Sequence, residues 1–422
     1  MRLTFICGEL PYPPNHGGTA DMWRRICALK EAGVKVRIVC WHEAAADDAA
    51  LVSYVAKVRE VAESVAVYPF QESGSSKIWR LANLFSLPWG ASARALSGKH
   101  FVALLANERA AAPDAVWLDG LFGGDVALKL ADALKTPLFY RSQNIEHRYI
   151  GYQLASAKGT KARLHWGLRN QGIRQFELKV MQRAQAFFDI SVDDLAWWRQ
   201  EGLTHGYWLP PLVDTGMTSA LSAPLTVPAT YDVGYLGNLF MPNNVFGVSW
   251  FVQEVVPLLL RQRPDARIFI AGNRPSEQIR ALLATTPHVV LIESPADAVP
   301  VLRDARVLIN PVFAGSGVNV KSVEMLFTPA HLVSTPKGLA GLPQTVVDCF
   351  QVADQPQAFA EAILKALQAP SAEGASSQRQ RARQLFLPGR IADILPVLQA
   401  APSLREHPGA LRDTPQPQET AQ

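Results

Sequence analysis

The stretch ARVLINPVFAGSGVNVKSVEML, residues 305–326, decides the fold expected for this chain. Its first half, ARVLINPV, is typical of a strand that is buried on both faces of a parallel sheet. The GSG turn at residues 315–317 lets the backbone approach a ligand closely, because glycine has no Cβ atom. A helix is expected to follow, with Lys321 and Glu324 on one face, since they are three residues apart. The sequence therefore predicts a strand, a glycine-rich turn and a helix at a binding site.

The start of this helix is suited to an anion. Backbone N–H groups without partners and a partial positive charge gather at a helix N-terminus. Lys321 lies in the first turn, where a cation is unfavourable unless an anion is bound there as well. A lysine for phosphate and Glu324 as an acceptor for hydroxyl groups suit a diphosphate attached to a ribose. A surface Lys–Glu pair after a flexible turn is the alternative.

Strands and helices alternate along the rest of the chain. Apolar runs that predict strands are LTFIC (3–7), VKVRIVC (34–40), DAVWLDG (114–120), TPLFYRS (136–142), AFFDIS (186–191), YDVGYLG (231–237), ARIFIAG (266–272), VVLIES (289–294) and HLVST (331–335). Strand–helix–strand units at this spacing predict parallel sheets with right-handed crossovers. The predicted fold class is α/β, with two doubly wound, Rossmann-like domains that face a cleft. Ligands of such sheets bind outside the carboxyl ends of the strands.

Composition shifts predict the domain boundaries. Residues 1–205 are expected to form an N-terminal Rossmann-like domain, and residues 206–229, rich in Pro, Ser and Thr, a linker. Residues 230–370 are expected to form a C-terminal Rossmann-like domain. Residues 371–400 are predicted to add C-terminal helices. Residues 401–422, rich in Pro, Gln and Thr, are predicted to be a disordered tail.

The bulk composition fits a globular enzyme. Of the 422 residues, 48% are hydrophobic and 18% charged, and the net charge is only +4. No basic and aromatic interleaving is present, so no nucleic-acid partner is expected. The four cysteines have no CxxC pair or metal-ligand spacing, which predicts small buried side chains in a reducing compartment. Without a signal peptide or a run of about 18 apolar residues, a cytoplasmic location is expected, either in solution or peripheral on a membrane.

Two further loops are candidates for anion contacts. In NHGGT, Gly17 and Gly18 precede the first predicted helix and could bring a second helix terminus to the anion; an ordinary flexible turn is the alternative. The GxGxxG turn of a dinucleotide site is missing from this long, proline-rich loop. In AGNRPSEQ, Arg274 follows a predicted strand and could clamp a phosphate through two hydrogen bonds. A solvated loop arginine is the alternative there.

Segments throughout the chain carry a resemblance to a known family. They are PYPPNHGG (11–18), QNIEH (143–147), YLGNLFMPNNVFGVSWF (235–251), PDARIFIAGNRP (264–275), SGVNVKSVE (316–324) and LVSTPKGLAGL (332–342). The chain resembles retaining glycosyltransferases of the GT-B fold, in the family 4-like group of bacterial cell-envelope and exopolysaccharide mannosyl- and glucosyltransferases. The resemblance implies an N-terminal acceptor-binding domain and a C-terminal donor-binding domain. It also implies sugar transfer from a nucleoside diphosphate sugar to an acceptor hydroxyl with retention, in cell-surface polysaccharide or glycolipid synthesis.

The resemblance also implies roles at the donor site. The family signature has two glutamates separated by seven residues, and Glu324 matches the second, which grips the ribose. At the position of the first stands Ser316, so a carboxylate that meets sugar hydroxyls is lost. Backbone amides between the two positions contact the phosphates, and their matches here are Gly317, Val318 and Asn319. The basic residue that meets the diphosphate is Lys321 or Arg274.

In the acceptor domain the chain departs from the family. Asp119 stands where many members have a histidine near the reacting carbon; it could bind a sugar hydroxyl or stabilise positive charge, and a helix cap is the alternative. Gln143 also stands where histidine is frequent. Glu146, His147 and His16 are candidates for acceptor contacts, or else caps and surface residues. The residues expected to take part in catalysis are Asp119, Lys321 and Glu324.

The expected chemistry needs no cofactor, since the nucleoside diphosphate sugar is a substrate. Helix N-termini and basic side chains can stabilise a departing diphosphate without a metal. No DxD-like pair stands at a strand end, and Asp193-Asp194 is expected to belong to a helix cap opened by Ser191. We therefore expect metal independence. Two other functions stay open: a nucleotide-sugar epimerase of the same fold, and a catalytically decayed nucleotide-sugar-binding module.

The predicted partners are a nucleotide-sugar donor and a glycan or lipid-linked acceptor. Residues 75–100 combine aromatic and aliphatic side chains, such as Trp79 and Trp89, with basic ones such as Lys77. This composition is typical of a segment that lies on the inner face of a membrane. An ordinary helix that is buried on one side would show the same pattern.

Overall fold

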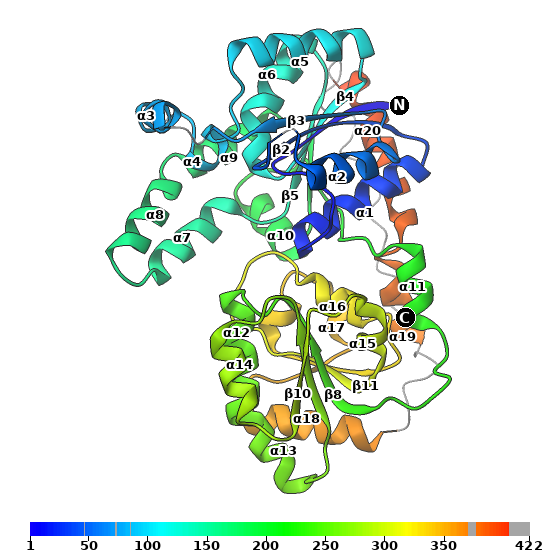
Figure 1. The fold of residues 1–422 in the computed structure, drawn as a ribbon. Coiled ribbons are helices and arrows are strands. Elements are labelled where there is room, and N and C mark those ends of the chain that lie inside the picture. The colour runs from blue at the N-terminus through cyan, green and yellow to red at the C-terminus, as the bar shows by residue number, and fades with distance from the viewer. Residues whose placement is uncertain (46, 72–73, 85, 370–376, 405–422) are drawn as a thin grey trace.

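The computed structural model describes residues 1–45, 47–71, 74–84, 86–369 and 377–404. Figure 1 shows two α/β domains, one above the other, with the C-terminal helices running along one side of both. The prediction of two doubly wound α/β domains is confirmed. Helix α20 (Leu395–Leu404) continues into the predicted tail. The rest of that tail lies outside the described residues.

A seven-stranded parallel sheet forms the centre of the N-terminal domain. Its strands are β1 (Arg2–Cys7), β2 (Lys35–His42), β3 (Ser64–Pro69), β4 (Ala115–Asp119), β5 (Leu138–Ser142), β6 (Ala186–Asp189) and β7 (Gly206–Trp208). They lie in the order β3-β2-β1-β4-β5-β6-β7, with every neighbouring pair parallel. The order reverses between β1 and β4. Strand β7 falls in the segment expected to be a linker; three residues are too few to show a strand periodicity.

Helices cover both faces of this sheet. The larger ones are α1 (Gly17–Glu31), α2 (Ala49–Arg59), α5 (Gly98–Ala111), α6 (Gly124–Leu134), α9 (Ile173–Arg183) and α10 (Val192–Gln200). Helix α1 buries Met22, Ile26 and Leu29, which recur at helical spacing, and its chain turns at Gly33 with a φ of +78°. The helices α3 (Gly74–Ala82), α4 (Trp89–Ser92), α7 (Glu146–Ser156) and α8 (Thr160–Asn170) project to one side of the domain (Figure 1).

The C-terminal domain has a six-stranded parallel sheet. Its strands are β8 (Tyr231–Leu236), β9 (Ile268–Gly272), β10 (Val289–Glu293), β11 (Ala305–Asn310), β12 (His331–Ser334) and β13 (Gln351–Val352). They lie in the order β10-β9-β8-β11-β12-β13, so this order reverses between β8 and β11. The helices are α12 (Pro242–Trp250), α13 (Val256–Gln262), α14 (Glu277–Ala284), α15 (Ala298–Arg303), α16 (Val320–Met325), α17 (Gln344–Val347) and α18 (Pro356–Gln368). A π-helical turn, Phe251–Val255, joins α12 to α13.

Two segments connect the domains. The first follows β7 and contains α11 (Thr215–Ser222). The second contains α19 (Ser377–Gln384), a 3₁₀ turn (Pro388–Asp393) and α20. Phe386 is buried in the core of the C-terminal domain, whereas Ile391, Ile394 and Leu398 are buried in the core of the N-terminal domain. The chain therefore returns to the domain in which it began.

The second connection also supports the helix after the glycine-rich turn. The guanidinium of Arg379 in α19 is buried and donates hydrogen bonds to four backbone carbonyls at and beyond the end of α16: Met325 (3.0 Å), Leu326 (2.9 Å), Thr328 (2.8 Å) and Ala330 (2.8 Å). Carbonyls at a helix C-terminus have no partner within the helix. The arginine satisfies them and fixes α16 from behind.

Candidate functional site

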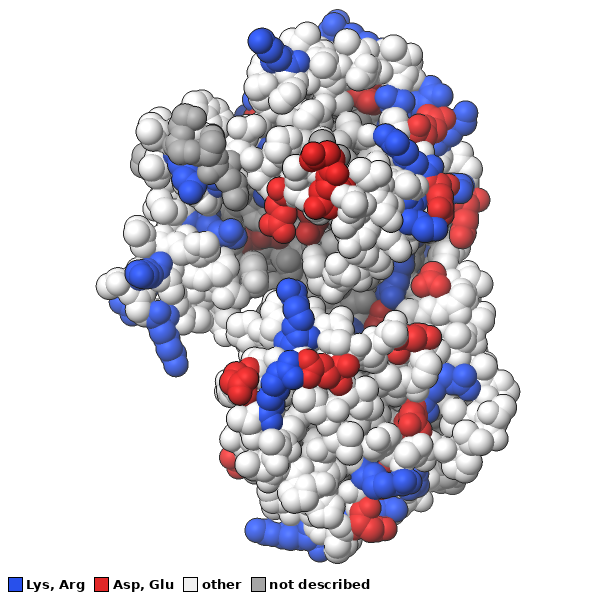
Figure 2. All heavy atoms as spheres, in the orientation of Figure 1, with Lys and Arg blue, Asp and Glu red and all other residues white. Residues whose placement is uncertain are grey.

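A cavity of about 260 Å³ opens between the two domains. Figure 2 shows the molecule hollowed where the domains face each other. The lining residues follow the carboxyl ends of strands in both sheets: Gly17, Gly18, Asp21, Gln143, Asn144, Ile190, Asn243, Val312, Ala314, Gly315, Ser316, Gly317, Val318, Asn319, Val320 and Lys337. This is the place where open parallel sheets bind ligands. The predicted donor-site residues from Ser316 to Asn319 line it together with Gly17 and Gly18.

The N-terminus of α1 meets the start of α16 across the cavity. A Cβ atom on Gly17 would lie 3.6 Å from Cγ2 of Val320, the first residue of α16. His16 caps α1: its Nδ1 accepts from the backbone N–H of Thr19 (3.4 Å). Glu9, whose Oε1 lies 3.4 Å from the ring, raises the pKa of His16. His16 thus has a structural role, and it is not among the described residues that line the cavity.

Gly317 brings the glycine-rich turn against the N-terminal domain. Its φ of +63° lies in the left-handed region, and a Cβ atom there would lie 2.5 Å from the carbonyl oxygen of Gln143 and 2.6 Å from Oδ1 of Asn144. Ser316 donates its hydroxyl to the same Oδ1 atom (2.8 Å). Only glycine combines this conformation with so close an approach. The turn therefore forms a contact between the domains as well as a wall of the cavity.

Lys321 follows Val320 of the cavity wall in α16, but it is not among the described residues that line the cavity. Its Nζ atom donates to the hydroxyl of Tyr235 (2.8 Å) and to Oδ1 of Asn244 (2.9 Å), and lies 4.5 Å from the Tyr235 ring centre. Burial lowers the pKa of Lys321 to about 7, although Glu324 acts in the opposite direction. The amine is therefore poised to become charged when an anion arrives near it.

Glu324 pairs with Arg24 of the other domain. The Nη2 atom of Arg24, in α1, lies 2.6 Å from Oε1 of Glu324, and both side chains are mostly buried. A third contact between the domains joins α10 to the segment after β12, where Asp193 accepts from the backbone N–H of Gly341 (2.8 Å). Gly341 also accepts from the backbone N–H of Val192 (3.0 Å). These contacts hold the cleft in the arrangement that forms the cavity.

Asp119 is not among the described residues that line the cavity; it belongs to a buried ionic network with Arg25. It accepts from Nε of Arg25 (3.1 Å), from the indole of Trp117 (3.1 Å) and from the amide of Gln143 (3.1 Å). Its side chain has no exposed surface. The alternative of a helix cap is wrong for Asp119, because the cap residue of the following turn, Leu121–Gly123, is Gly120 and no side chain caps this turn. Charge pairing with Arg25 explains why the carboxylate is held there.

The remaining candidates are Glu146, His147 and Arg274. Glu146 begins α7, and burial together with Glu177 raises the pKa of Glu146 to about 7. His147 contacts Glu177 through Nδ1 (2.6 Å), so it belongs to the support of α7. Arg274 stacks 4.2 Å above the ring of Phe240. Among the described residues, the cavity wall includes Gln143 but not Glu146 or Arg274.

The Asp193-Asp194 pair belongs to a helix start, as expected. Ser191 caps α10 by accepting from the backbone N–H of Asp194 (3.0 Å). Within the described part of the chain, no cluster of three His, Cys, Asp or Glu side chains is arranged to hold a metal ion. None of the helices described there combines the length and apolar character needed to cross a bilayer.

Four polar cavity residues were not singled out from the sequence: Asp21, Asn144, Asn243 and Lys337. Asn144 and Asn243 follow strand ends and lie within segments that carry the family resemblance. Lys337 lies in LVSTPKGLAGL, another such segment. These three could have been found from their positions. Asp21 lies inside the first helix and carries no comparable signal.

Known proteins resemble this chain in both sequence and fold. Residues 230–369 match the family described as glycosyl transferases group 1. The match covers β8 to α18, which includes the glycine-rich turn. Over 378 residues the chain is 23% identical to an uncharacterized 44.6 kDa protein in the cps region of Klebsiella pneumoniae, covering 86% of this chain and 90% of that one.

Solved structures share the architecture over almost the full length. Sucrose-phosphate synthase from Thermosynechococcus elongatus superposes with a TM-score of 0.65 at 14% identity, covering 96% of this chain and 100% of that one. HepE from Anabaena, solved with UDP, gives 0.61 at 13% identity with the same coverage. WaaG, described as a glycosyltransferase involved in lipopolysaccharide biosynthesis, gives 0.57 at 14% identity, covering 93% and 99%. The fold of this chain is GT-B.

Proposed function

We propose that the protein is a glycosyltransferase that moves a sugar from a nucleoside diphosphate sugar to an acceptor hydroxyl. The observation that carries this proposal is the shared cavity. The glycine-rich turn of the C-terminal domain and the N-terminus of α1 line it from opposite domains. Backbone N–H groups and helix termini on two sides of one cavity suit the charge of a diphosphate. HepE has been solved with UDP and with UDP-glucose, which makes uridine the first base to test.

The proposed mechanism uses positioning and charge. Backbone amides of residues 317–319 would meet the departing diphosphate, with Lys321 gaining a proton beside it. Glu324 would accept hydrogen bonds from the ribose. Attack of the acceptor hydroxyl from the same face, with a leaving-group oxygen taking its proton, would retain the anomeric configuration. Closure of the domains would exclude the water that hydrolyses the donor. No metal has a part in this scheme.

The acceptor is proposed to be a glycan or lipid-linked glycan of the cell surface. The resemblance to envelope and exopolysaccharide enzymes supports this, as does the similarity to WaaG. The proposal places the protein on the cytoplasmic side, in solution or peripheral on the membrane.

Thermal unfolding with UDP, GDP, ADP, CDP and TDP tests the proposal. A ligand at about 100 times its Kd stabilises the native state by roughly 2.7 kcal/mol. For domains of this size, each kcal/mol of stabilisation raises the unfolding midpoint by about 2–4 °C. We expect one nucleotide to shift the midpoint. If none does, the proposed nucleotide site is contradicted; if one does but its sugar conjugate is not turned over, the catalytically decayed binding module is favoured.

Turnover of the matching sugar nucleotide then tests the reaction. Turnover that requires an acceptor supports a transferase, whereas isomerisation of the sugar without one supports the epimerase. We expect a chelator to leave the rate unchanged; a strict requirement for Mg²⁺ or Mn²⁺ would contradict metal independence. The anomer of the product reports whether configuration is retained.

Donor binding is expected to weaken above neutral pH. The pKa of Lys321 is lowered to about 7 in the free protein. A bound diphosphate favours the ammonium and raises this pKa, so binding takes up a proton between pH 7 and the new value. Affinity should be highest below pH 7 and fall by up to about tenfold per pH unit above it. Calorimetry of a sugar nucleotide in buffers of different ionisation heat measures this uptake, and Lys321→Gln should abolish it.

We also propose that α3 contacts the membrane surface. Ile78, Trp79 and Leu81 are exposed on this projecting helix, Ile78 by 72%, so the alternative of an ordinary buried face does not describe these three side chains. An exposed aromatic and aliphatic group is typical of interfacial helices. Trp79→Ser combined with Ile78→Ser should reduce co-sedimentation with anionic vesicles. Val102→Ser, at an exposed apolar position on α5, is the matched control; an equal loss there would contradict the assignment.

A further inference from the structure

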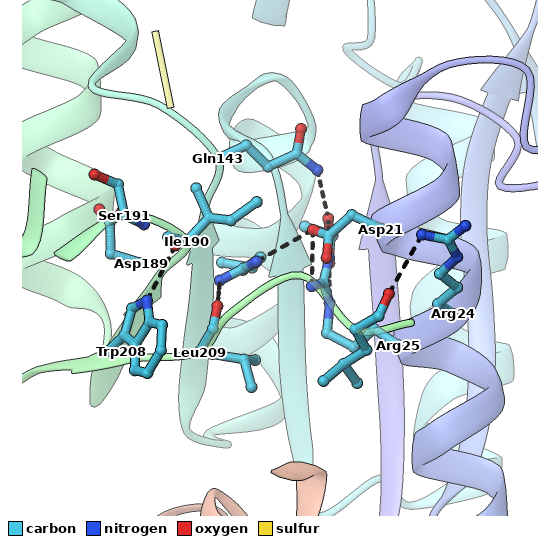
Figure 3. A network of polar contacts seen from close by, with 12 residues as sticks. Asp21, Arg24, Arg25, Gln143, Asp189, Ile190, Ser191, Trp208 and Leu209 are labelled. Atoms are coloured by element: carbon cyan, nitrogen blue, oxygen red, sulfur yellow. Dashed lines mark hydrogen bonds and ion pairs between the residues drawn. The ribbon is translucent and has the colours of Figure 1, made fainter. Parts of the chain in front are cut away.

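Asp21 presents a carboxylate oxygen without a partner at the wall of the cavity. The residue belongs to α1, lines the cavity and is only 1% exposed. Its Oδ2 atom accepts from Nη1 of Arg25 (3.0 Å) and from Nη2 of Arg141 (3.2 Å) (Figure 3). No residue in the described part of the chain donates a hydrogen bond to its Oδ1 atom. Buried polar atoms are normally satisfied, so a free one at a cavity wall points to a ligand.

The carboxylate is charged and fixed in place. Burial by itself would raise the pKa of Asp21, but Arg25 and Arg141 outweigh that effect and the pKa is lowered. An acid with a lowered pKa is a poor proton acceptor, which argues against a general base. It is a strong hydrogen-bond acceptor, because the acceptor in such a bond carries a charge. The group therefore suits the binding of a neutral donor such as a hydroxyl.

The glycine-rich turn on the opposite wall lacks such a group. Ser316 has only a hydroxyl, and that hydroxyl already donates to Oδ1 of Asn144. Gln143 is a second polar residue that the N-terminal domain contributes to the wall, and its amide donates to Asp119 (3.1 Å). Gln143 is half-buried, and we expect its side chain to rotate so that a ligand reaches Oδ1 of Asp21.

We propose that Oδ1 of Asp21 accepts a hydrogen bond from a hydroxyl of the donor sugar. The carboxylate that holds the sugar then comes from the N-terminal domain, across the cleft from the C-terminal domain. This inference rests on the proposed function. It makes Asp21 a residue that selects the sugar, separate from the contacts that hold the nucleotide.

The test compares binding of a nucleotide with binding of its sugar conjugate. UDP and UDP-glucose are titrated calorimetrically into the parent and Asp21→Asn, or GDP and GDP-mannose if guanosine is the base that stabilises the parent. We expect Asp21→Asn to weaken the sugar nucleotide by about 10- to 100-fold, since hydrogen bonds to charged groups are strong. Binding of the bare nucleotide should change by less than about threefold. Equal weakening of both ligands, or of neither, would overturn the inference.

Glu108→Gln is the matched control. Glu108 is a buried carboxylate of the same domain, paired with Arg37 (2.9 Å), and it does not line the cavity. Its loss should lower stability but leave both ligands unaffected. Sugar nucleotides that lack one hydroxyl add a second arm: one of them should bind less tightly to the parent and show no further loss in Asp21→Asn.

Asp21→Asn removes a negative charge that balances the buried guanidinium groups of Arg25 and Arg141, and such a loss can prevent folding. Asp21→Glu keeps the charge and moves the carboxylate by one methylene group. It should also lose affinity for the sugar nucleotide and keep the bare nucleotide; unchanged affinity for both would overturn the inference. If no nucleotide binds the parent, the proposed function fails and this inference fails with it.

Discussion

Replacing Glu324 by alanine is expected to abolish nucleotide binding while the fold survives. The carboxylate belongs to α16, the helix that follows the glycine-rich turn, and pairs with Arg24 at 2.6 Å. In the proposed site it accepts from ribose hydroxyls, and hydrogen bonds to a charged group contribute about 1.5–3 kcal/mol each. Losing two of them weakens binding by at least about 100-fold. Thermal unfolding of the parent and the variant with the stabilising nucleotide measures the loss.

Two variants isolate this effect. Glu361→Ala removes an exposed glutamate from α18, in the same domain but on a helix distant from the cleft (Figure 1), and should behave like the parent. Arg24→Ala removes the partner of Glu324 and leaves the carboxylate in place. If Glu324→Ala binds the nucleotide as tightly as the parent, the ribose assignment is wrong. If Arg24→Ala alone abolishes binding, the pair acts as a unit.

Replacing Gly317 by alanine is expected to lower the rate of sugar transfer by about 100-fold. The new Cβ atom would lie 2.5 Å from the carbonyl oxygen of Gln143, so the turn and the N-terminal domain must move apart. A misplacement of about 1 Å at a reacting centre can cost 10²-fold in rate. Nucleotide binding should weaken less, because its contacts lie mostly within one domain. Initial rates at saturating donor measure the effect.

Gly33→Ala is the control for backbone strain. Gly33 has a φ of +78° and nothing within 4 Å of the added Cβ position. Both substitutions place alanine in the left-handed region, at a cost of about 1–2 kcal/mol. Gly33→Ala should therefore lower the unfolding midpoint but leave the rate unchanged. If both variants lose rate to a similar extent, lower stability explains the loss, and the contact of Gly317 with the N-terminal domain does not.

Most of the architecture could be predicted from the sequence because local patterns encode it. Continuous apolar runs such as β4 and β11 are buried on both faces, and the helices between them force parallel pairing. The glycine-rich turn could be located for the same reason. Strands β3, β7 and β13 escaped detection: β7 has three residues, β13 has two, and no residue of β3 is fully buried.

The ionic contacts of the site could not be predicted, because they join residues that are distant in the chain. Asp119 looked like a helix cap from its neighbours, but its charge partner Arg25 is 94 positions away. Arg141 reaches Asp21 over 120 positions, and Arg24 reaches Glu324 over 300. No periodicity or motif reports such pairs. They arise only when the sheets assemble and the two domains close.

The return of the chain to its first domain has a consequence for the order of synthesis. Ile391, Ile394 and Leu398 complete the core of the N-terminal domain, yet they are translated only after the whole C-terminal domain. Domains generally fold as they leave the ribosome, the first one first. Here the first domain stays incomplete, with an apolar face uncovered, until the second has been made. Its maturation is therefore tied to that of the whole chain, and a prematurely terminated product would expose this face to aggregation.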